Sequence, residues 1–469
     1  MTDIDTASGA TPSRERDGGE VRDREGSGAR DRAGNILRNP VFRSFFLGQT
    51  ISAVGDAMVP VATAFAVLHI SGSITALGLV LAVLWASKLV MAPVAGQIAD
   101  RFARVRVLIW SDLVRCAVQA VLAVALLSGA ATIWALAAGT AVYGAASALF
   151  GPASMGLVTE TVDEEHRQRA NALVAISQNL IVMLGPAFSG LLATMGGYGV
   201  AYALDAASFL ASAVFLALLG RTRPSAFRAG RPLTEAAQET ALGAGEGERA
   251  HDAGGFLRRE LTRFREGVAV VNKHPWMWSS FFASAVTNVG TSAFFVLGPA
   301  ATEARLGGAT TWGLVGTAAS AGGLLGGMVA SRWRPRQPLV TGYLLMALLI
   351  PAELGALALG GEVVLIVTAG LAVAAIVFGT VLLDTAIQSQ VSQDAVARVD
   401  ALDTFISTLP MPLGLLAAGP AADLVGLPNL LIGMAVCTAL ANLAVLLARG
   451  ARTYQGLTTD NSLTEAELA

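Results

Sequence analysis

Apolar segments follow one another along the chain between residues 44 and 448, with short polar segments between them. Each is about 20 residues long, enough for a helix to cross about 30 Å of hydrocarbon. Because backbone groups in lipid must pair within their own segment, the pattern predicts membrane-spanning helices rather than loops. We expect twelve, at residues 44–68, 74–99, 105–127, 132–153, 170–193, 199–219, 277–299, 311–331, 339–358, 362–386, 399–422 and 428–448.

Positive charge lies almost entirely on one side of these helices. Of the 32 Lys and Arg residues, all except Lys88, Arg115 and Arg305 fall in the termini or at connections that follow even-numbered helices. Cytoplasmic connections retain Lys and Arg. We therefore expect a multi-pass protein of a bacterial inner membrane, with both termini in the cytoplasm.

Composition excludes several other classes of protein. Charged residues make up 14% of the chain, against about 25% in soluble proteins. The net charge of -2 offers no basic surface for nucleic acid. Two cysteines and four histidines supply no metal-ligand spacing, so we expect neither a cofactor nor an enzyme.

A long polar segment after the sixth helix divides the chain. We expect a solvated cytoplasmic tail, a six-helix bundle, a cytoplasmic linker, a second bundle and a second tail, at residues 1–39, 40–220, 221–275, 276–450 and 451–469. The first tail has too few apolar residues to fold. In the linker, apolar residues recur at helical spacing from Phe256 to Val271, which predicts an amphipathic helix on the membrane surface.

The two halves repeat each other. Residues 169–173, Arg-Ala-Asn-Ala-Leu, open the fifth helix, and residues 398–402, Arg-Val-Asp-Ala-Leu, open the eleventh. The same offset in residue number relates two further pairs, Gly185 with Gly414 and Gly190 with Gly419. Parallel repeats place a substrate site between the halves, near the middle of the membrane. The predicted fold class is an all-α membrane protein with twelve helices in two pseudo-symmetric six-helix bundles.

The connection between the second and third helices carries the most specific motif. Residues 96–108 read Gly-Gln-Ile-Ala-Asp-Arg-Phe-Ala-Arg-Val-Arg-Val-Leu, which resembles the signature loop of the major facilitator superfamily, with departures at Ile98, Ala103 and Val105. A glycine in the last turn allows close helix approach, and an acidic residue can bind the positive end of a neighbouring helix. The resemblance implies the major facilitator fold and a conformational latch made by Gly96, Asp100, Arg101 and Arg104 against the start of helix eleven, with Asp400 and Asp403.

A second motif lies on the fifth helix. Residues 185–190, Gly-Pro-Ala-Phe-Ser-Gly, resemble the end of the helix-5 motif of drug:proton antiporters, in which Gly185, Pro186 and Gly190 would kink the helix. Together with residues 169–173 and 204–210, this motif resembles the group that includes enterobactin and macrolide exporters. That resemblance implies export in exchange for protons. These antiporters often carry an arginine on helix four, and the fourth predicted helix has none.

Charged residues deep in the predicted helices are the next candidates. Asp56 and Lys88 lie near the middle of the first and second helices, where a charge costs about 2.5–3.5 kcal/mol on insertion scales. Two interpretations remain open: a static ion pair between them, or a proton-accepting Asp56 when the cavity opens outward. Arg115 is expected to reach the interface or to pair with Asp112, and Asp205 to lie near a helix end, within reach of water.

Polar residues also form stripes on two helices. On the first helix the stripe consists of Gln49, Ser52, Asp56 and Thr63. A slightly larger offset, the one that takes Gly55 to Gly290, maps its first three members onto the seventh helix, where the stripe is Ser284, Thr287 and Thr291, with Asn288 beside it. Stripes at matching depths predict a water-filled cavity between the halves, with hydrogen bonds between helices as the alternative.

These observations predict a secondary active transporter that exports a small amphipathic molecule, such as a drug, siderophore or other secondary metabolite, by alternating access. The resemblance implies proton antiport as the energy source. The central helices carry little fixed charge and several aromatic residues, Tyr143, Phe150, Phe294, Phe295 and Phe378. Expected partners are the small molecule, protons and the lipid bilayer, and the chain is expected to be a monomer. The alternatives are an importer of a small solute, a lysophospholipid- or lipid-flipping transporter of the same fold, and a non-transporting membrane sensor.

Overall fold

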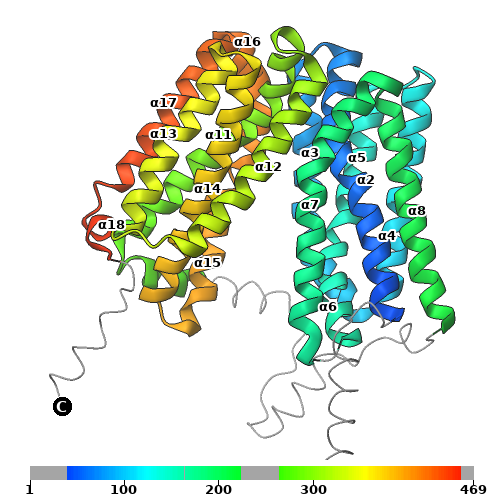
Figure 1. The fold of residues 1–469 in the computed structure, drawn as a ribbon, viewed down its shortest axis with the longest axis horizontal. Helices are drawn as coiled ribbons and strands as arrows, with labels where there is room; N and C mark the ends of the chain where they lie inside the picture. Colours follow the sequence, from blue (N-terminus) through cyan, green and yellow to red (C-terminus); the bar gives the residue numbers. More distant parts are fainter. Residues whose placement is uncertain (1–39, 163, 223–263, 456–469) are drawn as a thin grey trace, which may run out of the picture.

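The computed structural model describes residues 40–162, 164–222 and 264–455, and the regular elements in these ranges are all helices (Figure 1). Twelve helical segments among the described residues are long and apolar enough to span a membrane. The predicted fold class is therefore confirmed. The tail at 1–39 and most of the linker predicted at 221–275 lie outside the described residues.

The helices fall into two sets of six spans. The first set consists of α2 (Pro40–Ser71), α3 (Ile74–Arg101), α4 (Arg104–Leu127), α5 (Ile133–Ala148) continued by α6 (Phe150–Thr161), α7 (Glu164–Gly196) and α8 (Tyr198–Thr222). The second consists of α11 (Pro275–Arg305), α12 (Gly308–Arg332), α13 (Pro338–Leu359), α14 (Glu362–Gln390), α15 (Gln393–Thr408) continued by α16 (Met411–Val425), and α17 (Leu427–Val445), followed by the short α18 (Arg449–Thr453).

Several helices extend beyond the predicted bounds. Helix α7 begins at Glu164 rather than at residue 170, and α11 continues to Arg305 rather than ending at 299. The reason is that hydropathy marks only the part of a helix that lies in hydrocarbon, whereas polar residues continue the same helix beyond it.

Two predicted helices are interrupted. The fourth span breaks at Leu149, between α5 and α6, and the eleventh breaks at Leu409 and Pro410, between α15 and α16. A proline has no N–H to donate to the carbonyl four residues earlier. Pro152 and Pro410 therefore each remove one helical hydrogen bond beside the break.

Side-chain caps and a glycine define the connections between α2 and α3, between α4 and α5, and between α11 and α12. The Ser73 side chain accepts a hydrogen bond from the Ala76 N–H at 3.2 Å and caps α3. Thr132 caps α5 in the same way through Ala135, also at 3.2 Å. Gly307 has a φ of 91° between α11 and α12, a backbone conformation that favours glycine.

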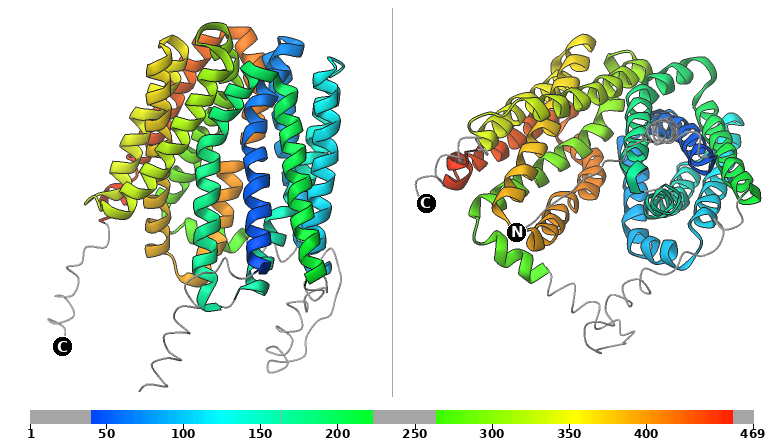
Figure 2. Two further views of the ribbon diagram at one scale, coloured as in Figure 1. Left: turned by 45° about the vertical axis from the view of Figure 1, so that its right-hand side comes forward. Right: turned by 60° about the horizontal axis from the view of Figure 1, so that its bottom comes forward.

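The two bundles touch at one end and diverge toward the other (Figures 1 and 2). The contacts between them pair α7 with α12 and α3 with α16. The diverging end is the one at which α6 and α15 lie, and the view onto it in Figure 2 shows two separate groups of helices. The arginines at the junctions of α3 with α4 and of α12 with α13, and Arg398 near the start of α15, all lie at this diverging end.

Contacts between the bundles agree with the internal repeat at both offsets in residue number. A β-carbon on Gly190 would lie 3.1 Å from the Cα of Thr310, and one on Gly419 would lie 2.5 Å from the Cα of Thr75. The two glycines are related by the offset that also takes Gly185 to Gly414. The two threonines are related by the slightly larger offset that takes Gly55 to Gly290. The end at which the bundles touch is thus built from two equivalent helix crossings with small residues between the backbones.

The described end of the linker packs against α15. Residues 264–271 are helical, and the Phe264 ring contacts that of Phe405 with centroids 5.8 Å apart. Glu266 and Arg398 form an ion pair, and Val271 is buried. The described part of the predicted amphipathic helix is therefore covered by protein on one side.

Candidate functional site

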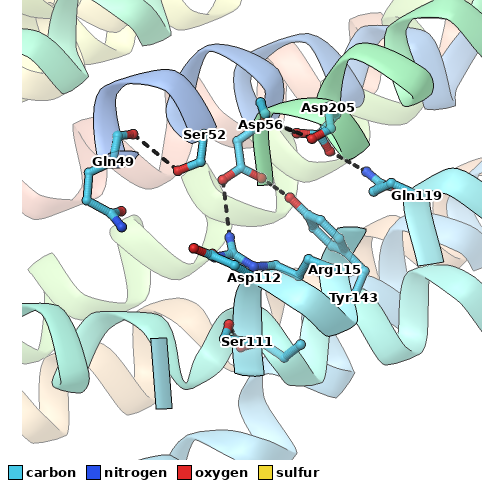
Figure 3. Close-up of polar contacts among 11 residues, drawn as sticks. Gln49, Ser52, Asp56, Ser111, Asp112, Arg115, Gln119, Tyr143 and Asp205 are labelled. Carbon is cyan, nitrogen blue, oxygen red and sulfur yellow. Dashed lines mark hydrogen bonds and ion pairs between the residues drawn. The ribbon is translucent and has the colours of Figure 1, made fainter. Parts of the chain in front are cut away.

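Asp56 lies in the middle of α2, between side chains from two other helices (Figure 3). Its Oδ2 is 3.4 Å from Nη1 of Arg115 on α4, and its Oδ1 accepts a hydrogen bond from the Tyr143 hydroxyl on α5. The Asp56 side chain is 35% exposed. Both carboxylate oxygens thus have partners, yet the group remains accessible.

Arg115 is held tightly in the interior of the first bundle. Its Nη2 lies 2.5 Å from Oδ1 of Asp112, which is one of the two alternatives that the sequence left open, and its side chain is 4% exposed. The guanidinium carbon lies 4.1 Å from the centroid of the Phe209 ring and 5.4 Å from that of Phe150. An ion pair and two aromatic faces together stabilise the cation in an apolar environment.

Asp205 belongs to the same cluster, contrary to the expectation that it lies within reach of water. It is fully buried on α8, where it accepts a hydrogen bond from Nε2 of Gln119 at 2.6 Å. A β-carbon on Gly55 would lie 2.8 Å from the Asp205 Cα. The absence of a side chain at Gly55 therefore lets α2 and α8 approach closely beside Asp56, and the crossing excludes water from Asp205.

Lys88 does not pair with Asp56. Among the described residues the cation within ion-pair distance of Asp56 is Arg115. A static pair between Asp56 and Lys88, one of the two interpretations that the sequence left open, is therefore not formed in this structure. The Lys88 ammonium lies 5.6 Å from the centroid of the Trp85 ring. It lines a cavity of about 330 Å³ inside the first bundle, and Asp56 lies in the wall of that cavity too.

The polar stripe of α2 divides between two cavities. Gln49, Ser52 and Asp56 line the larger cavity, of about 960 Å³, between the two bundles. Thr63 lines the smaller one, and its hydroxyl is 2.6 Å from that of Tyr202. Asp56 and Arg115 are shared by both cavities, so they form part of the wall between them.

The stripe predicted on the seventh helix is not brought to the large cavity. Thr287 accepts a hydrogen bond from Nδ2 of Asn442 at 3.1 Å, and Asn288 donates to the Ser407 carbonyl at 2.8 Å. These are contacts of α11 with α17 and α15, the alternative that the sequence left open. Ser284 and Thr291 are half-buried on α11, and they too lie outside the described cavity lining.

The wall that the second bundle gives to the large cavity is largely apolar. It consists of Phe295 on α11, two valines of α14 and mostly small residues along α12, of which Ser320 is polar, namely Gly316, Ala319, Ser320, Gly323, Leu324, Gly327, Val373 and Val377. The first bundle adds the polar residues Gln178 and Asn179 from α7. Of the aromatic residues singled out in the sequence, Phe150 and Phe295 line this cavity, and Phe294 and Phe378 are buried elsewhere.

The predicted latch residues lie at the diverging end. Arg101 is exposed and Arg104 half-buried at the start of α4, and the side chain of Asp100 is outside those described. A β-carbon on Gly96 would meet nothing within 4 Å, so the expected close helix approach at this glycine is not present. Asp400 and Asp403 are on α15 in the other bundle, and because the bundles diverge here, the latch stays a prediction.

The helix-5 motif makes close contacts. Helix α7 continues through Pro186 without a break. A β-carbon on Gly185 would lie 3.0 Å from the Ala57 carbonyl carbon of α2, while Gly190 packs against the start of α12. The Ser189 hydroxyl donates to the Met58 carbonyl at 2.6 Å. The motif therefore packs α7 against α2 of its own bundle and against α12 of the other bundle. The predicted kink stays a prediction.

Within the described part of the chain, His, Cys, Asp and Glu side chains form no group of three or more that could hold a metal ion. The ionisable residues around Asp56 could instead bind a proton or another cation reversibly. Three carboxyl groups (Asp56, Asp112 and Asp205) are close to two cations (Arg115 and Lys88), which leaves one negative charge in excess when all five are ionised. Binding of one proton or one external cation would neutralise the cluster.

Known proteins resemble this chain in sequence and in fold. A model of the Major Facilitator Superfamily matches residues 45–414. An uncharacterized MFS-type transporter of Bacillus subtilis (strain 168), YfiS, is 30% identical over 193 residues, which cover 39% of this chain and 45% of that protein. The alignment thus spans less than half of that relative.

Two solved structures share the fold. A bacterial homologue of the human lysosomal transporter Spinster, in an inward-facing and unoccupied conformation, gives a TM-score of 0.63 at 17% identity, covering 91% of this chain and 100% of that one. The peptide transporter POT in complex with sulfate gives 0.63 at 14% identity, covering 89% and 96%. At these identities the similarity shows the fold alone.

Proposed function

This chain belongs to the Major Facilitator Superfamily, and on that premise we propose that it is a secondary active transporter that exports a small amphipathic molecule in exchange for protons. The observation that supports this most is the position of Asp56. It is a charged group in the middle of a membrane helix, accessible from a cavity of about 960 Å³ between the two bundles. Such residues mark substrate and proton pathways.

The orientation that we propose places the arginine-bearing end in the cytoplasm of a bacterial inner membrane. Cytoplasmic connections retain positive charge, and the bundles diverge at this end (Figure 1). In this orientation the structure is an inward-facing state, the state in which an exporter takes up its substrate. Export itself rests on the helix-5 motif at residues 185–190 and on the resemblance to exporters.

In the proposed alternating-access cycle, the moving contacts are the two equivalent crossings at the other end. Separation of Gly190 from Thr310 and of Gly419 from Thr75 would open the cavity outward, while the diverging end closes. We propose that closure brings the loop with Arg101 against α15, so that the latch forms only in the outward-facing state. A single chain contains both bundles, so a monomer suffices.

Proton coupling at Asp56 is tested by transport in everted membrane vesicles. With the wild type, an imposed pH gradient should drive accumulation of a fluorescent amphipathic probe against its concentration gradient. Asp56→Asn should abolish that accumulation, because the residue that carries the proton is lost. Downhill equilibration should continue at a saturating probe concentration, because the cavity remains.

The matched control is Asp423→Asn, the same change at an exposed position on α16. It should transport like the wild type. If Asp56→Asn accumulates the probe as well as the wild type does, Asp56 has no part in coupling.

A further inference from the structure

The large cavity presents a carboxylate to whatever enters it. Two of its lining residues in the described part of the chain are charged, Asp56 and Arg115. The Asp56 side chain is 35% exposed and that of Arg115 is 4% exposed. The negative group of this pair is therefore the one within reach of a ligand.

Arg115 neutralises Asp56 incompletely. Its contact with Asp112 is 2.5 Å long, whereas the contact with Asp56 is 3.4 Å long. Coulomb attraction falls with distance, and Asp112 competes for the same guanidinium. The second cation, Lys88, faces the smaller cavity and lies against the Trp85 ring.

The opposite wall suits an apolar body. Helix α12 presents Gly316, Ala319 and Gly323 to the cavity, and α14 adds Val373 and Val377. Small side chains leave a broad surface against which rings or short alkyl groups can lie. The volume of about 960 Å³ is near the upper end of the range for pockets that bind drug-sized molecules.

The geometry points to a monovalent organic cation as the substrate: a protonated amine or a quaternary centre that lies at Asp56, with an apolar body against α12 and α14. The Phe295 ring in the same lining adds an aromatic group, a kind of side chain that attracts organic cations. An organic anion of the same shape would meet the Asp56 carboxylate, and the described lining offers it no exposed cation. This inference rests on the proposed function and adds the charge of the transported molecule.

Two ions of nearly the same shape and opposite charge, tetraphenylphosphonium and tetraphenylborate, test the inference. Binding of each radiolabelled ion to the purified full-length protein in lipid nanodiscs is measured by equilibrium dialysis, with empty nanodiscs subtracted. The phosphonium should bind at least about tenfold more tightly than the borate, because the accessible wall carries a carboxylate.

Variants assign that preference to one residue. Asp56→Asn should weaken phosphonium binding at least about tenfold, Asp56→Glu should retain the preference because it keeps the charge, and Asp423→Asn should bind like the wild type. Thermal unfolding and gel filtration verify that each variant is folded. Should Asp56→Asn not fold, the comparison of the two ions on the wild type decides.

Equal or tighter binding of the borate, binding of neither ion, or undiminished phosphonium binding by a folded Asp56→Asn would each overturn the inference. The proposed function fails on a separate observation. If no amphipathic compound, neutral ones included, is moved by a pH gradient in proteoliposomes, the chain is not a proton-coupled exporter, whichever ion binds.

Discussion

Replacing Gly313 with leucine should weaken the end at which the bundles touch. A β-carbon at this position of α12 would lie 3.1 Å from the Pro186 carbonyl carbon and 3.3 Å from the Ala187 Cα, both on α7. These are backbone atoms, so they cannot rotate away. Overpacking of this kind costs about 1–3 kcal/mol. Because the overlap exists only while the bundles touch, the ratio of the inward-facing to the outward-facing state should fall by about 5- to 150-fold.

Distance measurement by double electron–electron resonance reports this shift. Spin labels are attached at Ala130 and Val363, exposed positions near the touching end, one in each bundle, after both natural cysteines are replaced with serine. Gly313→Leu should lengthen the distance between the labels. Gly355→Leu is the control, because a β-carbon there meets nothing within 4 Å. An unchanged distance in Gly313→Leu, or an equal change in Gly355→Leu, would refute the argument.

Two further predictions concern the charge cluster and the orientation. Arg115→Met should lower the free energy of unfolding by about 3–5 kcal/mol, because it leaves buried carboxylates without their cation, whereas the exposed Arg334→Met should change it by less than about 0.5 kcal/mol. Thermal unfolding followed by gel filtration measures both, and equal stability of the two variants would show that the cluster is not stabilised by Arg115. For the orientation, a membrane-impermeant thiol reagent should label Ala130→Cys in intact cells and Phe102→Cys only after the membrane is permeabilised. Labelling of Phe102→Cys from outside would reverse the topology and the direction of transport that we propose.

The spans, the one-sided distribution of charge and the internal repeat were predictable from sequence because each depends on local composition or spacing. Gly190 and Gly419 illustrate this well, since the offset they share with Arg169 and Arg398 predicted that they are equivalent, and the structure gives them equivalent contacts. The breaks at Leu149 and Leu409 were not predicted. Pro152 and Pro410 lie beside them, but Pro186 and Pro351 lie within unbroken helices, so a proline alone does not predict a break.

The composition of the site was predictable only in part. The depth of Asp56 identified it, but its partners depend on which helix faces meet in the bundle. Tyr143 is 87 residues away and Arg115 is 59 residues away, and hydropathy does not distinguish Arg115 from Lys88 as the partner. Gln119 likewise gave no signal, because a single glutamine within an apolar helix predicts no particular contact.

The polar stripe on the seventh helix also shows that sequence alone did not predict which side chains line the cavity. The offset that takes Gly55 to Gly290 correctly relates α2 to α11, yet Thr287 and Asn288 bind neighbouring helices whereas Ser52 and Asp56 line the cavity. Equivalent positions in a repeat need not share a role, because the side chains of the facing helices differ between the halves.

The most direct test measures proton and substrate movement together. The purified protein is reconstituted in proteoliposomes with an internal pH dye, and the substrate is one found by growing cells with and without the protein on a panel of toxic compounds. Downhill exit of the substrate should drive protons into the vesicles, and Asp56→Asn should abolish this proton entry. Substrate exit without proton entry, or proton entry that is unchanged in Asp56→Asn, would contradict the account.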